Sequence, residues 1–129
     1  MIVKQLISKE IVRVGKDATL REVAKVMREK DVSSVLLTDG DEAVGIVTER
    51  DVTGAVAEGL DYNTPAERLA KRPLITIEGE RNVYEALELM GQKRIRHLVV
   101  TEGGKPVGIV SLREVANAIG LMMAEENRY

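Results

Sequence analysis

The feature that most constrains this chain is an internal repeat at a constant offset of 63 residues. The stretch Gly45-Ile46-Val47-Thr48-Glu49-Arg50-Asp51 returns as Gly108-Ile109-Val110-Ser111-Leu112-Arg113-Glu114. Residues 2–56 align with 65–119 without a gap, and the identities fall in predicted helices, turns and strands alike. A local composition bias would not produce that spread. The chain is therefore a duplication, and we expect both copies to fold in the same way.

Hydrophobic patterning predicts the same elements in each copy. In the first copy we expect a helical turn at 3–8, strands at 11–14, 34–38 and 43–47, and helices at 20–30 and 49–58. Thr19 and Glu22 form a capping box for the first of these helices. In the second copy we expect a helical turn at 65–70, a strand at 74–77, a helix at 82–92, a hairpin at 97–110 and a helix at 112–123. The predicted class is α/β of the α+β type, with two β-α-β-β-α halves.

The offset also sets the expected domain boundaries. The first repeat covers 1–59, a linker covers 60–64, the second repeat covers 65–123 and a tail covers 124–129. We expect the last residues, 125–129, to fray.

Composition excludes several classes of function. The net charge of −2 gives no overall field for DNA or an anionic membrane, so any anion site must be local. The chain has no Cys and one His, which excludes disulfides, thiolate zinc sites and a multi-histidine metal site within one chain. The N-terminus does not match a signal peptide, and no apolar run approaches the roughly 20 residues of a membrane span, so we expect a soluble, cytoplasmic protein. A charged fraction of 31% without Phe or Trp hints at a thermophilic source.

Candidate binding residues lie where a strand passes into a helix in each copy. Thr48 is followed three residues later by Asp51, and Ser111 is followed at the same spacing by Glu114. Unpaired helical N–H groups, a hydroxyl and a carboxylate together suit a phosphorylated, ribose-bearing ligand. The same residues also serve as plain helix caps that offset the helix dipole, and the two roles are not exclusive.

The duplicated β-α-β-β-α order and the repeated Gly-Ile-Val-Thr/Ser motif resemble the cystathionine-β-synthase (CBS) domain family. Residues 1–123 are similar to a tandem CBS pair, also called a Bateman module, and the segments 95–100 and 107–111 are typical of it. The resemblance implies two half-domains about a pseudo-twofold axis, with clefts between their sheets that bind adenosine derivatives.

The resemblance also implies which residues form the two sites. In the family the acid holds the ribose hydroxyls, the Thr or Ser holds the phosphate, and the other repeat completes the cleft. The expected primary site consists of Thr48, Asp51, Arg50, Ile75, Thr76, Ile95, Arg96 and His97. The expected second site consists of Ser111, Glu114, Arg113, Val12, Val32 and Ser33. The second site has Glu where the family has Asp, and it has serines in place of Arg96 and His97.

We therefore expect a stand-alone sensor that binds AMP, with ADP, ATP or S-adenosylmethionine as the other adenosine ligands to test. We expect no catalysis, cofactor or metal, because the sequence has a single His, His97, no Cys and no catalytic or phosphate-loop motif. We also expect a homodimer that forms a disc of four repeats, and an effector protein of unknown identity. The alternative is a ligand-free structural module that only dimerises. Nucleic-acid binding is disfavoured by charge and by scarce aromatic residues, although residues 71–72, 93–94 and 96 include a local group of basic side chains.

Overall fold

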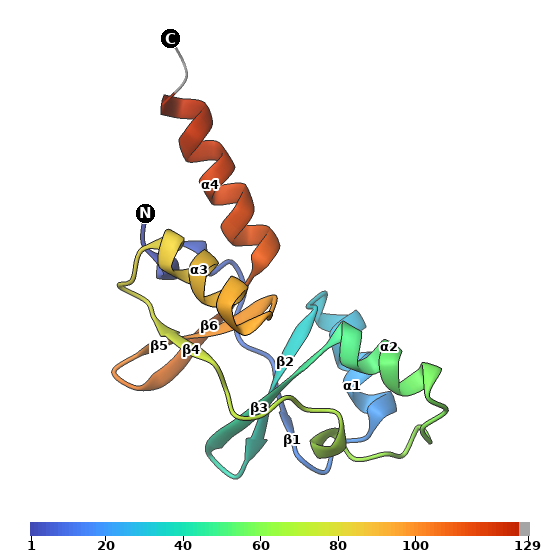
Figure 1. Cartoon of the computed structure of the whole chain (residues 1–129). Helices are drawn as coiled ribbons and strands as arrows, with labels where there is room; N and C mark the ends of the chain where they lie inside the picture. The colour runs from blue at the N-terminus through green and yellow to red at the C-terminus, as the bar shows by residue number, and fades with distance from the viewer. Residues whose placement is uncertain (127–129) are drawn as a thin grey trace. The chain divides into compact units, whose positions relative to one another are not determined.

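The computed structural model describes residues 1–126, and these contain two copies of one α+β arrangement (Figure 1). The elements of the first copy are η1 (Val3–Leu6), β1 (Arg13–Gly15), α1 (Leu20–Lys30), β2 (Ser34–Asp39), β3 (Glu42–Thr48) and α2 (Glu49–Ala57). Those of the second copy are η2 (Ala66–Arg68), β4 (Thr76–Glu78), α3 (Val83–Lys93), β5 (His97–Glu102), β6 (Lys105–Ser111) and α4 (Leu112–Glu126). The predicted fold class and the predicted order of elements are confirmed.

Each copy builds a three-stranded sheet with the same pairing. β1 pairs parallel with β2, which pairs antiparallel with β3, and β4, β5 and β6 repeat this order. A register shift follows Leu37 in one hairpin and Val100 in the other, which are equivalent positions of the repeat. Strands β1 and β4 begin two residues later than predicted. The first hydrogen bonds that each receives from the neighbouring strand go to the carbonyls of Val12 and Ile75, so pairing starts at the residues that follow these two.

The compact units of the structure differ from the two sequence repeats. One unit, here called the central unit, spans Ile11–Leu74, and the other, the terminal unit, combines Met1–Glu10 with the chain from Ile75 onward. The stretch expected as a linker lies inside the central unit, where Leu20 N–H donates to the Thr64 carbonyl at 2.8 Å and Arg21 N–H donates to the Tyr62 carbonyl at 3.1 Å. The first element of each repeat thus packs with the body of the other repeat.

The core of the central unit lies between the β1-β2-β3 sheet and its helices. Thr19 caps α1 by accepting from the Glu22 N–H at 3.1 Å, which is one of the two bonds of the predicted capping box, and α1 buries an apolar face. The buried cluster also takes in side chains from η2 and the turn after it. Its members are Val14, Leu20, Val23, Met27, Val35, Leu37, Val47, Ala55, Ala66 and Leu69.

The core of the terminal unit is the counterpart, and it includes one residue from the start of the chain. Val3 of η1 is fully buried, and its N–H donates to the Arg81 carbonyl at 2.8 Å. The Lys4 ammonium pairs with Glu80 and Glu102, and the hydrogen bond and charge of Glu80 raise the pKa of Lys4. The buried cluster consists of Val3, Ile77, Ala86, Met90, Leu98, Val100, Val110 and Val115.

Helix α4 is longer than predicted. It runs to Glu126, so the expectation that the chain frays from residue 125 is wrong for Glu125 and Glu126, and residues 127–129 lie outside the described part. Figure 1 shows the outer turns of α4 extending past α3 in the terminal unit. An apolar first half, with Val115 and Ala118 buried, holds the helix on the unit's core, and the remaining turns continue the helical ladder beyond it.

Candidate functional site

The first candidate pair, Thr48 and Asp51, forms a reciprocal cap at the start of α2. Thr48 has extended backbone angles, and its N–H donates to Asp51 Oδ2 at 2.9 Å. The Thr48 hydroxyl lies 3.1 Å from the same oxygen, and the Asp51 N–H approaches Thr48 Oγ1 at 3.4 Å. The structure therefore brings these two predicted residues together, and Oδ2 of Asp51 is committed to the cap.

The second carboxylate oxygen of Asp51 faces a cation that the sequence analysis did not assign to this site. Lys71 Nζ lies 3.2 Å from Asp51 Oδ1. The Asp51 side chain is 8% exposed and that of Lys71 is 75% exposed, so a buried carboxylate meets an ammonium that remains largely in water. The repeat offset relates Lys71 to Ser8, and in the other copy Ser8 contacts the equivalent acid, Glu114.

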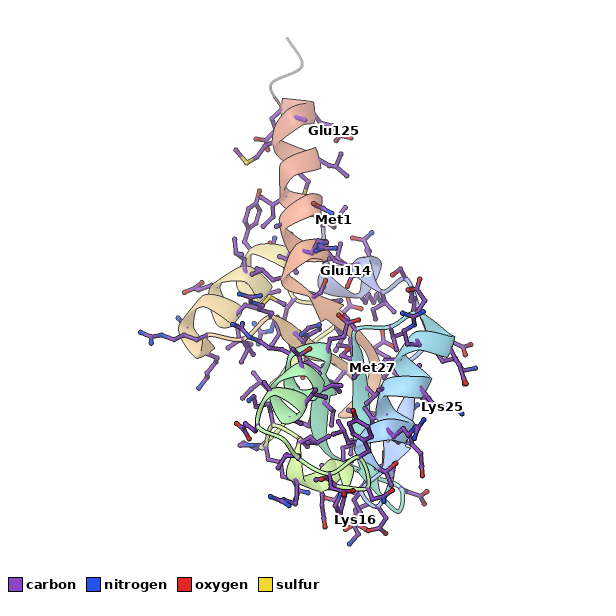
Figure 2. All side chains as sticks on the ribbon, turned by 90° about the vertical axis from the view of Figure 1, so that its right-hand side faces the viewer. Met1, Lys16, Lys25, Met27, Glu114 and Glu125 are labelled. Carbon is purple, nitrogen blue, oxygen red and sulfur yellow. The ribbon has the colours of Figure 1, made fainter. Side chains whose placement is uncertain are left out.

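The second candidate pair, Ser111 and Glu114, repeats the cap with a longer acid. The Ser111 N–H donates to Glu114 Oε1 at 2.9 Å, and the Glu114 N–H donates to Ser111 Oγ at 3.2 Å. The Ser8 hydroxyl donates to Glu114 Oε2 at 3.3 Å. Glu114 lies in the first turn of α4, and Glu125 marks the other end of that helix (Figure 2). The two caps thus differ in their third partner, which is an ammonium at Asp51 and a neutral hydroxyl at Glu114.

The remaining residues of the expected primary site, apart from Arg50, belong to the terminal unit. Ile75 immediately precedes β4, and Thr76 is the first residue of that strand. Ile95 follows α3, and its N–H donates to the Met90 carbonyl at 3.0 Å. The Arg96 carbonyl accepts from the Leu112 N–H at 2.8 Å, and His97 pairs with Ser111 in the sheet. Within this unit, Arg96 and His97 therefore lie beside the Ser111 cap.

The equivalent residues of the central unit lie beside the Thr48 cap. The Ser33 carbonyl accepts from the Glu49 N–H at 3.0 Å, and the Val32 N–H donates to the Met27 carbonyl at 3.1 Å. Val12 stands at the entrance to β1, where its carbonyl accepts from Leu36. The arginines after the two hydroxyl residues, Arg50 and Arg113, are exposed in the first turns of their helices. The residues expected for each site belong partly to one unit and partly to the other.

An open hollow elsewhere in the terminal unit is unsuited to a nucleotide. It has a volume of roughly 430 Å³, lies between β4 and α3, and includes Thr76 in its lining. The carboxylates of Glu78, Glu85 and Glu88 share that lining with the single guanidinium of Arg81. Three acids against one cation would repel a phosphate. The strand-to-helix junctions are therefore the better candidates.

Across residues 1–126, no three side chains from His, Asp and Glu gather closely enough to hold a metal ion. In the same part of the chain, no helix has both the length and the apolar character needed to cross a bilayer.

Comparisons with known proteins identify relatives that match most of the chain. The model of the CBS domain family matches residues 3–58 and 66–121. An uncharacterized 17.7 kDa protein of Acidianus ambivalens is 33% identical over 119 residues, which is 91% of this chain and 72% of that protein. An uncharacterized protein of Methanopyrus kandleri is 35% identical over 117 residues, and there the match covers 88% of this chain and 60% of the relative.

Solved structures agree with these matches. A CBS domain protein from Pyrobaculum aerophilum, complexed with AMP, is 34% identical and superposes with a TM-score of 0.85, covering 97% of this chain and 99% of its own. An uncharacterized conserved protein from Pyrococcus horikoshii is 32% identical with a TM-score of 0.83, covering 91% and 90%.

Proposed function

Since this chain belongs to the CBS domain family, we propose that it is a regulatory module that binds an adenine nucleotide, with AMP as the first ligand to test. The observation that carries the proposal is the burial and hydrogen bonding of the Asp51 carboxylate. Its carboxylate is almost fully buried, one oxygen is fixed by Thr48, and the other faces outward to an exposed ammonium. A carboxylate so placed accepts hydrogen bonds from ribose hydroxyls, and each charge-assisted bond contributes about 1.5–3 kcal/mol before desolvation. The AMP complex of the Pyrobaculum aerophilum protein supports the choice of ligand.

The proposed primary site follows the family resemblance. Asp51 would hold the ribose, and Thr48 with the start of α2 would hold the phosphate, where the helix dipole favours an anion. Arg50, Arg96 and His97 would supply further polar contacts to the phosphate. Backbone groups of Ile75, Thr76 and Ile95 would meet the adenine edge.

We propose a weaker second site on the same plan. It would use Ser111 and Glu114, together with Arg113, Val12, Val32 and Ser33. Glu114 already holds Ser8 as well as Ser111, and its chain is one methylene longer than that of Asp. A ribose there would have to displace the Ser8 hydroxyl from a more mobile carboxylate.

A nucleotide acts as a signal only if it binds two states of the protein with different affinities. We propose that the chain is not an enzyme and that an unidentified effector protein reads the bound state. We also propose that it works as a homodimer. Exposed apolar side chains on α3 and α4, including Tyr84, Leu87 and Leu121, favour self-association.

The direct test is calorimetric titration of the purified chain with AMP. Asp51→Asn keeps the shape of the side chain but removes its charge, and we expect its AMP dissociation constant to rise at least tenfold, which corresponds to about 1.4 kcal/mol. Asp39→Asn is the matched control, because Asp39 is an exposed residue at the hairpin turn, and it should bind AMP like the parent. Equal binding by Asp51→Asn and the parent would refute the assignment.

A second candidate function is a structural module that dimerises without a ligand. The observation in its favour is that capping alone accounts for the contacts of Thr48 with Asp51. A thermal-shift screen of AMP, ADP, ATP and S-adenosylmethionine separates the two functions. A ligand at 100 times its dissociation constant adds about 2.7 kcal/mol to the free energy of unfolding. If none of the four compounds raised the melting temperature, the structural module would be favoured.

A further inference from the structure

Lys71 is held so that its backbone is fixed and its ammonium can move. Its N–H donates to the Ile46 carbonyl at 2.9 Å and its carbonyl accepts from the Ile46 N–H at 3.2 Å, which attaches this residue to the edge strand β3. Ile46 lies two residues before Thr48, at the end of the strand where α2 begins. The side chain, by contrast, is 75% exposed on a flexible four-carbon stem.

The ammonium occupies the oxygen that a ribose would need. Asp51 Oδ2 accepts from the Thr48 N–H, so Oδ1 is the oxygen that remains for an incoming hydroxyl. Lys71 Nζ lies 3.2 Å from this Oδ1. A ribose that binds Asp51 therefore competes with Lys71. Because the Lys71 side chain is already largely in water, the ammonium can leave this carboxylate for another anion without first being exposed to solvent.

We propose that Lys71 is an exchangeable counter-ion that makes this site prefer phosphorylated nucleosides. The proposal rests on the proposed nucleotide site. In the empty protein the ammonium neutralises the buried Asp51. When a ribose diol takes Oδ1, the ammonium moves from the carboxylate to the phosphate at the start of α2. An unphosphorylated nucleoside displaces Lys71 and offers it no new anion, whereas a nucleotide replaces one ion pair with another.

The other copy of the repeat supports this role, because it has no charge at the equivalent position. Ser8 corresponds to Lys71 at the 63-residue offset, and its hydroxyl donates to Glu114 Oε2 at 3.3 Å. A neutral hydroxyl can occupy the carboxylate oxygen but cannot follow a phosphate. The inference therefore assigns the preference for phosphate to the Thr48/Asp51 junction and not to the Ser111/Glu114 junction.

The test compares AMP with adenosine by calorimetry, in the parent chain and in Lys71→Met, which keeps the stem and removes the charge. We expect the AMP dissociation constant of Lys71→Met to rise about tenfold, the typical effect of losing one charge-assisted contact. We expect its adenosine dissociation constant to stay the same or fall, because the competitor is gone. The ratio of the two constants should therefore change at least tenfold. Lys71→Arg should restore the preference for AMP.

The matched control is Lys16→Met. Lys16 is a half-exposed lysine of the same unit that pairs with Asp39 at 3.7 Å, and its N–H bonds to Thr38 at the opposite end of the β2-β3 hairpin from Thr48. It should leave the AMP-to-adenosine ratio unchanged.

The outcomes separate this inference from the function on which it rests. If the parent binds AMP and Lys71→Met keeps the parent's ratio, the counter-ion role is wrong while the nucleotide site stands. If Lys71→Met weakens both ligands equally, the lysine is only structural and the inference is also wrong. If the parent binds neither compound, the proposed function fails and this inference fails with it.

Discussion

At the scale of single residues, two glycines permit a close approach in the two copies. A Cβ added at Gly108 would lie 2.5 Å from Cδ1 and 2.6 Å from Cγ1 of Ile7. A Cβ at the equivalent Gly45 would lie 3.0 Å from the carbonyl oxygen of Lys71 and 3.2 Å from Cβ of Ala70. The repeated motif therefore begins with glycine because, in each copy, another segment of the chain lies directly against the strand at this position.

This geometry predicts that Gly108→Ala destabilises the protein. The new methyl group would collide with Ile7, and forced repacking of this kind lowers the free energy of unfolding by about 1–3 kcal/mol. Urea unfolding measures the loss. In an Ile7→Ala background the same substitution should cost clearly less, because the colliding atoms are gone.

Gly91→Ala provides the control for this prediction. Gly91 is exposed inside α3, and no atom lies within 4 Å of an added Cβ. Alanine there should raise stability by roughly 0.5–1 kcal/mol through helix propensity. If Gly108→Ala were as harmless as Gly91→Ala, the close packing of Ile7 on β6 would be wrong.

At the scale of elements, α3 offers a test of self-association. Leu87 is 38% exposed on α3, and Val107, on strand β6 of the same unit, is also 38% exposed. If the helices form the proposed dimer interface, Leu87→Glu places a charge in a buried apolar contact. We expect its dimer dissociation constant to rise at least tenfold, or about 1.4 kcal/mol, because charge burial without a partner is unfavourable.

Light scattering over a range of concentrations checks this expectation. Val107→Glu introduces the same charge at a position of equal exposure, so the general effect of an added glutamate is controlled. It should associate like the parent. A monomeric parent chain would remove the homodimer from the proposed function, and equal weakening by both variants would show that α3 is not the interface.

The elements were predictable because their signals are local. Thr19 and Glu22 predict the start of α1 from four residues of sequence, and the Thr48/Asp51 spacing predicts the cap of α2 in the same way. The end of α4 was harder to predict, because the acidic run near Glu125 resembles a frayed tail and yet remains helical. Helix ends are set by hydrogen bonding along the backbone as well as by composition.

Lys71 was missed as a site residue because its role depends on distant packing. The sequence places it 20 residues after Asp51, in a basic pair beside Arg72. The ion pair exists because the chain after η2 returns to β3 and forms the bridge at Ile46. Periodicity describes which face of an element is apolar, but it does not specify which other segment will cover that face.

At the scale of the whole molecule, the duplicated sequence and the compact units divide the chain differently. Residues Ala66 and Leu69 begin the second repeat in sequence, yet they are buried in the core of the central unit. The Ala66 N–H also donates to the Ala18 carbonyl, and the Leu20 N–H donates to the Thr64 carbonyl. A fragment cut at the repeat boundary would lose these contacts.

This difference predicts which fragment folds. Fragment 11–74 contains the complete central core, and we expect cooperative urea unfolding with the low stability usual for a domain of about 60 residues. Fragment 1–59 is of similar length but lacks Ala66 and Leu69, so it should leave one face of its core open and unfold without cooperativity. Circular dichroism during urea titration distinguishes the two fragments.

Leu69→Ala in fragment 11–74 removes one core side chain and should destabilise the fragment by roughly 2–5 kcal/mol. If fragment 1–59 unfolded cooperatively and fragment 11–74 did not, the sequence repeat would be the folding unit. The packing of η1 and η2 against the other repeat would then form late in folding.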